Sequence, residues 1–351
     1  MSKSLVGVDI SATSVRAVEV ADAGSAKPVI LRVAECPLAE GAVSRGEVLE
    51  PNTVAAALKQ LWSIGRFRSK NVVLGMGNQR VLSRDLTVPS APMDQIRESL
   101  PFQVQDLLPV PVVDAILDFY PIEEGEGDGG PVIRGLLVAA VKDSVLQNVK
   151  AVQLAGLNPV GVDLIPFALT RQLVSRAGVT GTVAMVDVGA ETTSVVIATN
   201  GVPQFVRIIS TGGEDVTMEL AVTLEISRDQ AEAVKRHLGM VDGDGRTADD
   251  KRAIVITQQS AGELLISLRN TINYFVNTHP DQPVAQVVLA GGGSQLRGFR
   301  EAMRDFVRLP VSHGNAFGGA GYARSIDPRR IDDHGVSIAV AYGLAAGRRA
   351  A

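Results

Sequence analysis

The sequence predicts an α/β protein built from two similar halves, and three observations lead to this prediction. A strand-like segment that ends in aspartate and a turn of small residues occurs twice, around Asp9 and around Asp187. The two copies lie 178 residues apart, about half of the 351-residue chain. Glycine-rich junctions between a strand and a helix follow at 211–213 and 290–293. A repeat of this length indicates two half-molecules rather than a solenoid, whose repeats span roughly 20–50 residues.

The composition excludes several classes of protein. Apolar residues make up 46% of the chain and charged residues 21%, an ordinary balance for a globular protein. The net charge of −4 gives no basic surface for nucleic acid, and the single cysteine, Cys36, excludes an intrachain disulfide. Because no apolar run reaches about 18 residues, we expect neither a signal peptide nor direct membrane insertion. The sequence therefore predicts a globular protein of the cytoplasm.

Each half is expected to begin with a meander of three strands. Turn-forming residues at 22–25 and at Asn200-Gly201 separate the second strand from the third in the two copies. The predicted strands are residues 6–10, 15–20 and 29–33 in the first copy, and 185–188, 194–198 and 204–209 in the second.

The two turns are suited to binding phosphate. Small and hydroxyl-bearing residues after Asp9 and Asp187 let phosphate oxygens approach backbone N–H groups closely. The aspartates would hold a hydrated Mg²⁺, which prefers one or two carboxylates together with waters. Either turn alone could be an ordinary hairpin with an acidic tip. Their pairing favours a clamp around a triphosphate.

The segment 85–164, between the two copies, is expected to form a small α/β subdomain of its own. The acidic, glycine-rich stretch 123–130 is expected to be a mobile loop between two strands. Gly156 is suited to end the second helix of the segment. The expected elements are a helix at 94–108, strands at 115–120 and 132–141, a helix at 143–155 and a strand at 160–164.

Further helices follow the second copy. Gly212-Gly213 precedes a helical run through Leu220, and Ser227 opens a helix through a capping box that ends near Gly239. A second acidic loop is expected at 241–252. The remaining predicted elements are a long helix at 254–278, a strand at 287–290, a helix at 296–307 and a C-terminal helix at 335–344.

The order of these motifs resembles that of the actin-like ATPases, which include actin, Hsp70 and sugar kinases. The Asp9 turn, the Asp187 turn and the run Ala290–Gly293 correspond to the phosphate-one, phosphate-two and adenosine motifs of that superfamily. The resemblance implies a ribonuclease H-like fold of two lobes with a nucleotide between them. The chain departs from the pattern at Ser11, where the superfamily usually has glycine.

Within this superfamily the chain is most similar to the PilM family of type IV pilus assembly proteins, which is related to FtsA. The likeness lies in residues 5–10, 14–20, 86–89 and 102–109. It implies binding of ATP or ADP with Mg²⁺, slow or absent ATP hydrolysis, and docking of the N-terminal cytoplasmic peptide of a PilN-like single-spanning membrane protein. It also implies contacts with other pilus platform or motor proteins, self-association, and a peripheral location at the inner membrane through a protein partner.

The resemblance also implies which residues form the site. Asp9 and Asp187 would hold Mg²⁺ through water, while Glu191 and Thr192 are the candidates for positioning a catalytic water. The expected nucleotide-binding residues are Asp9, Ser11, Ala12, Thr13, Ser14, Arg16, Asp187, Gly189, Ala190, Glu191, Thr192, Thr193, Gly212, Gly213, Glu232, Lys235, Gly291, Gly292, Gly293, Ser294 and Leu296.

The same likeness implies a division into subdomains. Lobe one would consist of 1–84, 165–184 and 331–351 (1A), with 85–164 as the inserted FtsA/PilM-type subdomain, of the SHS2 class (1C). Lobe two would consist of 185–215 and 284–330 (2A), with 216–283 as its own subdomain (2B).

Two other functions remain open from the sequence. A filament-forming division protein of the FtsA type would carry an amphipathic membrane helix at its end, and 345–351 has no apolar face. A small-molecule kinase would need a carboxylate base beside a sugar pocket, and such kinases are usually longer. No metal-ligand spacing of histidines, Walker A motif or GxSxG motif points to another catalytic class.

Overall fold

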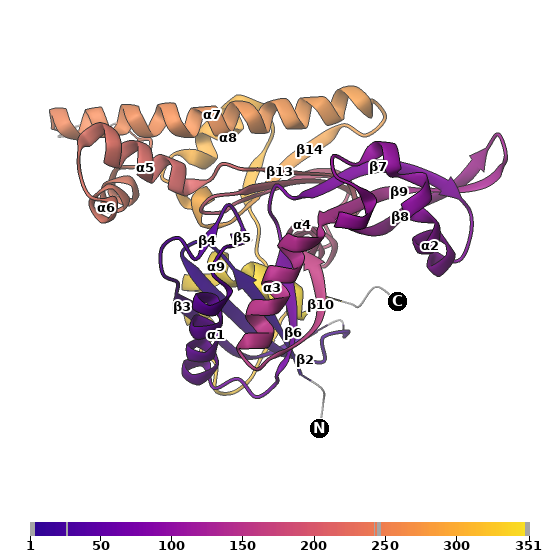
Figure 1. The fold of residues 1–351 in the computed structure, drawn as a ribbon. Helices are drawn as coiled ribbons and strands as arrows, with labels where there is room; N and C mark the ends of the chain where they lie inside the picture. The colour runs from indigo at the N-terminus through magenta and orange to yellow at the C-terminus, as the bar shows by residue number, and fades with distance from the viewer. Residues whose placement is uncertain (1–3, 26, 242, 244–246, 348–351) are drawn as a thin grey trace.

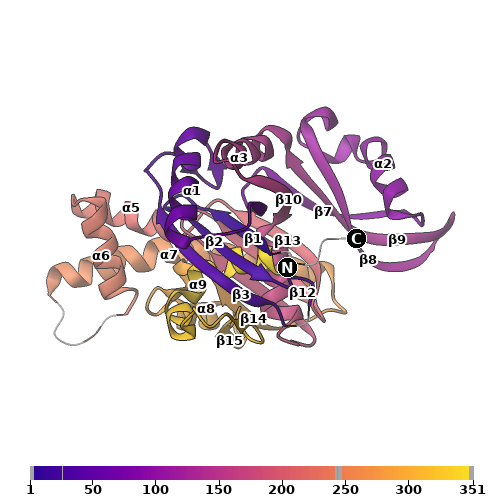
Figure 2. The same ribbon diagram turned by 90° about the horizontal axis from the view of Figure 1, so that it is seen from below.

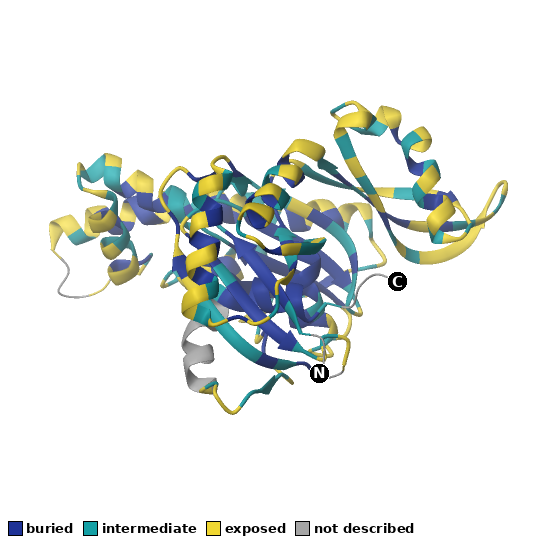
Figure 3. Ribbon diagram, turned by 60° about the horizontal axis from the view of Figure 1, so that its bottom comes forward, coloured by how far each residue is buried: buried dark blue, intermediate teal, exposed yellow. Residues whose placement is uncertain are grey.

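The computed structural model describes residues 4–25, 27–241, 243 and 247–347. Two lobes, each built on its own β-sheet, form the body of the molecule, and a smaller three-stranded sheet and a helical subdomain lie at opposite ends of it (Figures 1 and 2). The strands of the body are largely buried, whereas the three-stranded sheet is mostly exposed toward its tip (Figure 3).

The first lobe contains a six-stranded sheet of order β10-β6-β1-β2-β3-β16. Helices α1 (Pro51–Gly65) and α3 (Lys142–Leu154) pack on one face, and α4 (Ile165–Thr170) and α9 (Pro328–Ala345) pack on the other. The strands are β1 (Leu5–Ile10), β2 (Ser14–Ala21), β3 (Val29–Pro37), β6 (Asn71–Met76), β10 (Asn158–Leu164) and β16 (Gly321–Tyr322).

The second lobe contains a five-stranded sheet of order β13-β12-β11-β14-β15. One face is covered by α7 (Ala248–Thr278) and α8 (Phe299–Val307), and the other packs on the same core as α4 and α9. A single hydrophobic core therefore joins the two lobes. The strands are β11 (Thr182–Val188), β12 (Thr193–Thr199), β13 (Val202–Ile209), β14 (Val284–Ala290) and β15 (Val311–His313).

The internal repeat seen in the sequence is a structural repeat. In the strand register, Asp9 of β1 lies opposite Arg16 of β2, and Asp187 of β11 lies opposite Ser194 of β12. These are equivalent positions of the two meanders. The turns also match, because the N–H of Ser11 donates to Ser14 O at 3.0 Å and that of Gly189 donates to Thr192 O at 2.9 Å. The third strand is antiparallel to the second in both copies.

The inserted sheet has the order β7-β9-β8, and helix α2 (Met93–Gln103) covers one face. Its strands are β7 (Val81–Pro89), β8 (Ala115–Gly127) and β9 (Gly130–Val141). The expected helix at 94–108 ends earlier, at Gln103, and a short 3₁₀ turn follows at Gln105–Leu107.

The acidic stretch 123–130, expected as a mobile loop, forms the outer part of the β8–β9 hairpin. Only Asp128 and Gly129 form the turn. The backbone pairing continues outward although the side chains there are exposed, and the Glu123–Arg134 ion pair at 2.7 Å joins the two strands.

The structure differs from the predicted subdomain boundaries. Strand β10 pairs in parallel with β6 of the six-stranded sheet, and α3 packs on α1, so 142–164 belongs to the first lobe rather than to an insertion 85–164. The insertion instead begins with β7 at Val81 and ends with β9 at Val141. Residues 182–184, expected in lobe one, are the start of β11 in the second sheet.

The helical subdomain of the second lobe contains α5 (Gly213–Leu224), α6 (Arg228–Leu238) and the first half of α7. Helix α6 has the capping box expected at Ser227, whose Oγ accepts from the N–H of Gln230 at 3.3 Å. Helix α7 starts at Ala248, inside the expected loop 241–252, because Thr247 caps it; residues 242 and 244–246 of that loop lie outside the described residues. Over the part of the chain that is described, no helix has both the length and the apolar character needed to cross a membrane.

Candidate functional site

A cavity of about 820 Å³ lies where the two aspartate turns meet, with walls from both lobes and from α6. Of the residues expected from the sequence, the following line it: Asp9, Ser11, Ala12, Thr13, Ser14, Arg16, Asp187, Gly189, Ala190, Glu191, Thr192, Gly213, Glu232, Lys235, Gly291, Gly292, Gly293 and Leu296.

Three expected residues do not line this cavity and instead support its walls. The Thr193 hydroxyl donates to Thr211 O at 2.7 Å, and the Ser294 hydroxyl donates to Gly291 O at 2.7 Å. Gly212 is the N-cap of α5, and its N–H donates to Asp215 at 2.7 Å. Gly212 therefore serves the architecture of the second turn, whereas Gly213, the first residue of α5, lines the cavity.

The N-terminus of α5 fixes the second turn. The N–H of Gly213 donates to Gly189 O at 2.9 Å, and the N–H of Glu214 donates to Ala190 O at 2.7 Å. A side chain at Gly212 could not be accommodated, because a Cβ there would lie 2.5 Å from Ala190 O. The turn is thus held in place before any ligand arrives.

Asp9 and Asp187 carry the main electrostatic feature of the cavity. Both side chains are nearly inaccessible, with 5% and 9% exposed residue surface. Burial and the neighbouring Asp9 charge raise the pKa of Asp187 to about 7, and burial also raises the pKa of Asp9 although Arg16 opposes this. Two buried carboxylates in one cavity favour a bound cation, since it would relieve the repulsion between them.

Arg16 is the internal counter-charge in this part of the cavity. Its Nη1 lies 3.2 Å from Asp9 Oδ2, and its Nε donates to Glu35 at 2.8 Å. The Ser14 hydroxyl donates to the same Glu35 oxygen at 2.8 Å. Glu35, which sequence reasoning missed, therefore holds Arg16 beside the first turn. The predicted strand 29–33 ends before Glu35, whereas β3 continues to Pro37.

The glycine run after β14 approaches the second aspartate closely. Gly291 has φ of +78°, and a Cβ there would lie 2.5 Å from Asp187 Oδ1. At Gly292, by contrast, a Cβ would meet nothing within 4 Å. Gly292 faces open cavity space, so this stretch leaves room for a flat group beside the backbone.

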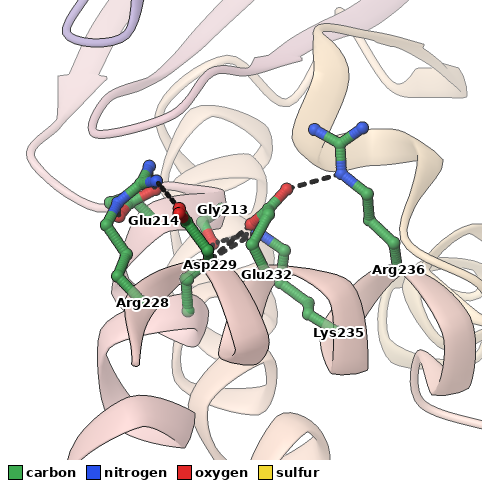
Figure 4. A network of polar contacts seen from close by, with 8 residues as sticks. Gly213, Glu214, Arg228, Asp229, Glu232, Lys235 and Arg236 are labelled. Carbon is green, nitrogen blue, oxygen red and sulfur yellow. Dashed lines mark hydrogen bonds and ion pairs between the residues drawn. The ribbon is translucent and has the colours of Figure 1, made fainter. Parts of the chain in front are cut away.

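Helix α6 forms a charged wall of the cavity (Figure 4). Lys235 Nζ donates to Gly213 O at 2.9 Å and to Thr217 Oγ1 at 2.7 Å, and it lies 2.6 Å from Glu232. Burial opposes ionisation of Glu232, but hydrogen bonds from Lys235, Arg236 and Thr217 outweigh it and lower its pKa to about 2. Glu232 is therefore charged at neutral pH.

Arg228 and Arg236 extend this wall, and sequence reasoning missed both. Arg228 makes two hydrogen bonds to Glu214, at 2.6 and 2.9 Å, and Arg236 donates to Glu232 at 2.6 Å (Figure 4). Both are four residues from Glu232 on the same helix, so helical spacing could have added them to the Glu232 and Lys235 face.

Glu191, the candidate for positioning water, is already engaged. Its Oε2 accepts the backbone N–H of Arg45 at 2.5 Å, and Arg45 lies in the first lobe. Thr192 lines the cavity, and its carbonyl closes the second turn by accepting the N–H of Gly189 at 2.9 Å.

The side chains present fit a hydrated Mg²⁺ rather than a metal bound only by protein. Within the described residues, no group of three or more His, Cys, Asp or Glu side chains is placed to hold a metal ion. The pair Asp9 and Asp187 supplies the one or two carboxylates that Mg²⁺ requires when phosphate oxygens and waters complete its shell. Bound there, the ion would neutralise the carboxylates and the charge of a phosphate chain.

Comparison with known proteins identifies the family. The family model described as type IV pilus assembly protein PilM matches residues 7–349. The chain belongs to the PilM family. A solved structure described as a PilM–PilN type IV pilus biogenesis complex has 27% sequence identity and a TM-score of 0.84, over 97% of each chain. The sequence analysis expected this family from residues 5–10, 14–20, 86–89 and 102–109, and that expectation is confirmed.

Other matches bear on the fold. The cell division protein FtsA of Bacillus subtilis is 25% identical over 194 residues, covering 51% of this chain and 44% of that protein. The chain thus spans about half the length of the curated relatives it matches. MreB5 of Spiroplasma citri, solved with AMPPNP, is 13% identical with a TM-score of 0.55, over 98% of this chain and 95% of that chain. The expected two-lobed actin-like fold is confirmed.

Proposed function

We propose that the chain binds ATP or ADP with Mg²⁺ in the interlobe cavity and works as an adaptor in type IV pilus assembly. As an adaptor, it docks the N-terminal cytoplasmic peptide of a PilN-like membrane protein. The observation that carries the nucleotide proposal is the pair of matched turns, each with a buried aspartate, that face one cavity with an open glycine run.

Each wall of the cavity has a distinct part in this proposal. The turns at 11–14 and 189–192 receive the phosphates, and Arg16 exchanges its contact with Asp9 for a phosphate oxygen. Asp9 and Asp187 hold Mg²⁺ through water. The nucleoside lies between the open side of Gly292 and the Glu232–Lys235 face of α6.

We propose slow or absent ATP hydrolysis. In-line attack on a γ-phosphate needs a polar group that orients water. The carboxylate of Glu191, the residue expected to do this with Thr192, accepts a hydrogen bond from the Arg45 backbone instead. The nucleotide would then stabilise one arrangement of the lobes rather than drive rapid turnover.

The junction of the inserted sheet with the first lobe is the proposed docking place for the peptide. Tyr120 of β8 and Phe167 of α4 lie with ring centroids 4.9 Å apart across this junction. Three buried polar atoms have no hydrogen-bond partner among the described residues: Ser83 Oγ on β7, and Arg171 Nε and Gln172 Nε2 in the π-helical turn that continues α4.

Buried polar atoms without partners are costly, so a ligand that opens this junction and supplies the partners would gain affinity. An extended peptide main chain offers such donors and acceptors, while its apolar side chains can pack beside Tyr120 and Phe167. We expect affinity near the micromolar range, about 8 kcal/mol, with little dependence on salt. Docking of this kind would place the chain at the cytoplasmic face of the inner membrane through its partner, where other platform or motor proteins could bind it.

The nucleotide proposal is tested by Asp187→Ala. We expect Mg-ATP affinity to fall by at least about tenfold, about 1.4 kcal/mol, because an anchor of the cation is lost. Isothermal calorimetry gives the measurement. Gly292→Val is the comparison, since it fills open space on the nucleoside side and should weaken ADP as much as ATP. Unchanged Mg-ATP binding by Asp187→Ala would mean that the second turn is structural only.

The docking proposal is tested by Gln172→Leu. Leucine removes the unpaired buried amide nitrogen, so the free energy of unfolding should stay the same or rise. The affinity for the peptide should fall about fivefold through one lost hydrogen bond. The probe is a synthetic peptide with the cytoplasmic N-terminal sequence of the PilN-like partner, measured by fluorescence anisotropy.

Gln153→Leu, an exposed position on α3, serves as the matched control. If Gln172→Leu and Gln153→Leu bound the peptide with equal affinity, the junction would not be the docking place.

A further inference from the structure

A short hairpin of the first lobe reaches across the cavity to the second lobe. Strands β4 (Val43–Ser44) and β5 (Glu47–Val48) are joined by the two-residue loop Arg45-Gly46. Both loop residues have positive φ, +49° at Arg45 and +77° at Gly46, as the tight hairpin turn requires. Arginine rarely adopts this conformation, and such outliers tend to persist where surrounding contacts hold them in place.

The Gly46 side of the hairpin is fixed to the first lobe. Asn78, whose residue surface is 0% exposed, donates through Nδ2 to Gly46 O and to Ser144 Oγ, both at 3.0 Å. Arg80 lies 3.0 Å from Glu47 of β5. The loop is therefore anchored to the first lobe.

The tip of the hairpin is bound to the second lobe. The Arg45 guanidinium pairs with Asp215 at 2.9 Å and donates to Ser210 O, and its backbone N–H donates to Glu191 at 2.5 Å. Beside it, the Ser210 hydroxyl donates to Gln79 of the first lobe at 2.8 Å. These contacts join segments 131–170 residues apart in the chain.

Two partners of Arg45 belong to the second turn or to the helix that fixes it, and one of them, Glu191, lines the cavity. Glu191 belongs to the second turn, and Asp215 caps α5, whose first amides fix that same turn. Gly46 lines the cavity, so the neighbouring Arg45 contacts lie at the rim of the cavity. The two lobes cannot separate at this rim without breaking the Arg45 contacts. The same movement would release the Glu191 carboxylate.

We propose that Arg45 is a clasp across the cleft, a positioning residue that controls nucleotide exchange and holds Glu191 away from the phosphate side. The inference rests on the proposed nucleotide site. With the clasp closed, a bound nucleotide leaves slowly and Glu191 cannot orient water. With the clasp open, exchange is fast.

The test is the release of a fluorescent ADP analogue, chased with excess ATP in a stopped-flow instrument. We expect Arg45→Ala to release it about tenfold faster than the unaltered chain, because opening of the cleft limits release. Asp215→Asn removes the charge of the ion pair while its amide oxygen can still accept the Gly212 N–H, so it should act in the same direction without loss of the helix cap. Arg45→Ala with Asp215→Asn should be no faster than Arg45→Ala alone.

Arg134→Ala is the matched control, since it removes an exposed arginine whose ion pair with Glu123 lies within the inserted sheet. It should release the analogue at the unaltered rate. Hydrogen exchange without nucleotide is the second measurement, and Arg45→Ala should increase exchange in 43–48 and 210–215. Hydrogen exchange does not depend on nucleotide binding. If the chain bound no nucleotide, the proposed nucleotide function would be wrong, and hydrogen exchange would still test the clasp. Unaltered release and unaltered exchange in Arg45→Ala and Asp215→Asn would overturn the clasp.

Discussion

At the scale of single residues, the sequence indicates those whose role depends on local order. Asp9 and Asp187 are found because each ends a strand before a turn of small residues, and the structure places both in one cavity. Arg45 is not found, because its contacts to Glu191 and Asp215 bridge 146 and 170 residues, and a lone arginine beside a glycine has no distinctive pattern. Local motifs predict the two aspartate turns of the site, while the rim depends on how the lobes meet.

The raised pKa of Asp187 predicts how the stability of the metal-free protein depends on pH. The folded chain holds this proton up to about pH 7, whereas the unfolded chain releases it near the ordinary value of 3.8. Because the folded state binds more protons between these values, the free energy of unfolding should fall as pH rises toward 7, by up to about 1.4 kcal/mol per unit. Denaturant titrations in EDTA from pH 5 to 8 give the measurement.

Asp187→Asn isolates this contribution, because the amide does not titrate. Its stability relative to the unaltered chain should increase from pH 5 to 7 and then stay level. A stability difference that is constant over the whole range would show that Asp187 does not titrate there.

At the scale of elements, capping patterns predict helix ends better than hydrophobic spacing does. Ser227 places the start of α6 correctly, since its hydroxyl satisfies an amide of the first turn. The start of α7 was expected at 254, where its apolar pattern begins, but the cap at Thr247 starts it at Ala248 with a charged first turn. The sequence pattern does not predict the outer part of the β8–β9 hairpin, because backbone hydrogen bonds maintain it without a face of buried side chains.

Helix α6 allows a prediction about this capping. Ser227→Ala removes the acceptor for the N–H of Gln230 and should lower the stability of the helical subdomain by about 1 kcal/mol. Glu232 and Lys235 lie on this helix, so fraying of its first turn should also lower nucleotide affinity, but only slightly. Hydrogen exchange of 228–238 is the measurement, with Gln259→Ala at an exposed position of α7 as control. Equal protection in the two variants would contradict the role of the cap.

At the scale of the whole molecule, chain order did not reveal which segments share a sheet. Residues 142–164 follow the inserted strands directly, so the sequence grouped them with the insertion. The structure instead returns α3 to pack on α1 and adds β10 to the sheet edge beside β6. Such long-range pairing is set by the fit of buried faces, here Ala151, Val152 and Leu157 in the core of the first lobe.

This difference leads to a prediction about excision of the insertion. Arg80 O accepts the N–H of Val141 at 3.0 Å, so the two ends of the insertion are adjacent and two glycines can join residue 80 to 142. The shortened chain should unfold cooperatively at a lower temperature, since it loses Tyr120 and Leu136 from the shared core, and should keep nucleotide affinity.

Removal of 85–164 instead takes away β10 and α3, leaves β6 as an unpaired edge, and opens the core around α1. That chain should fail to fold, because an exposed edge strand and exposed apolar faces favour aggregation. Circular dichroism during heating and calorimetry with Mg-ADP compare the two. If the chain without 85–164 folds and binds nucleotide as well as the chain without 81–141, β10 and α3 are dispensable to the first lobe, and the assignment of 142–164 to it is wrong.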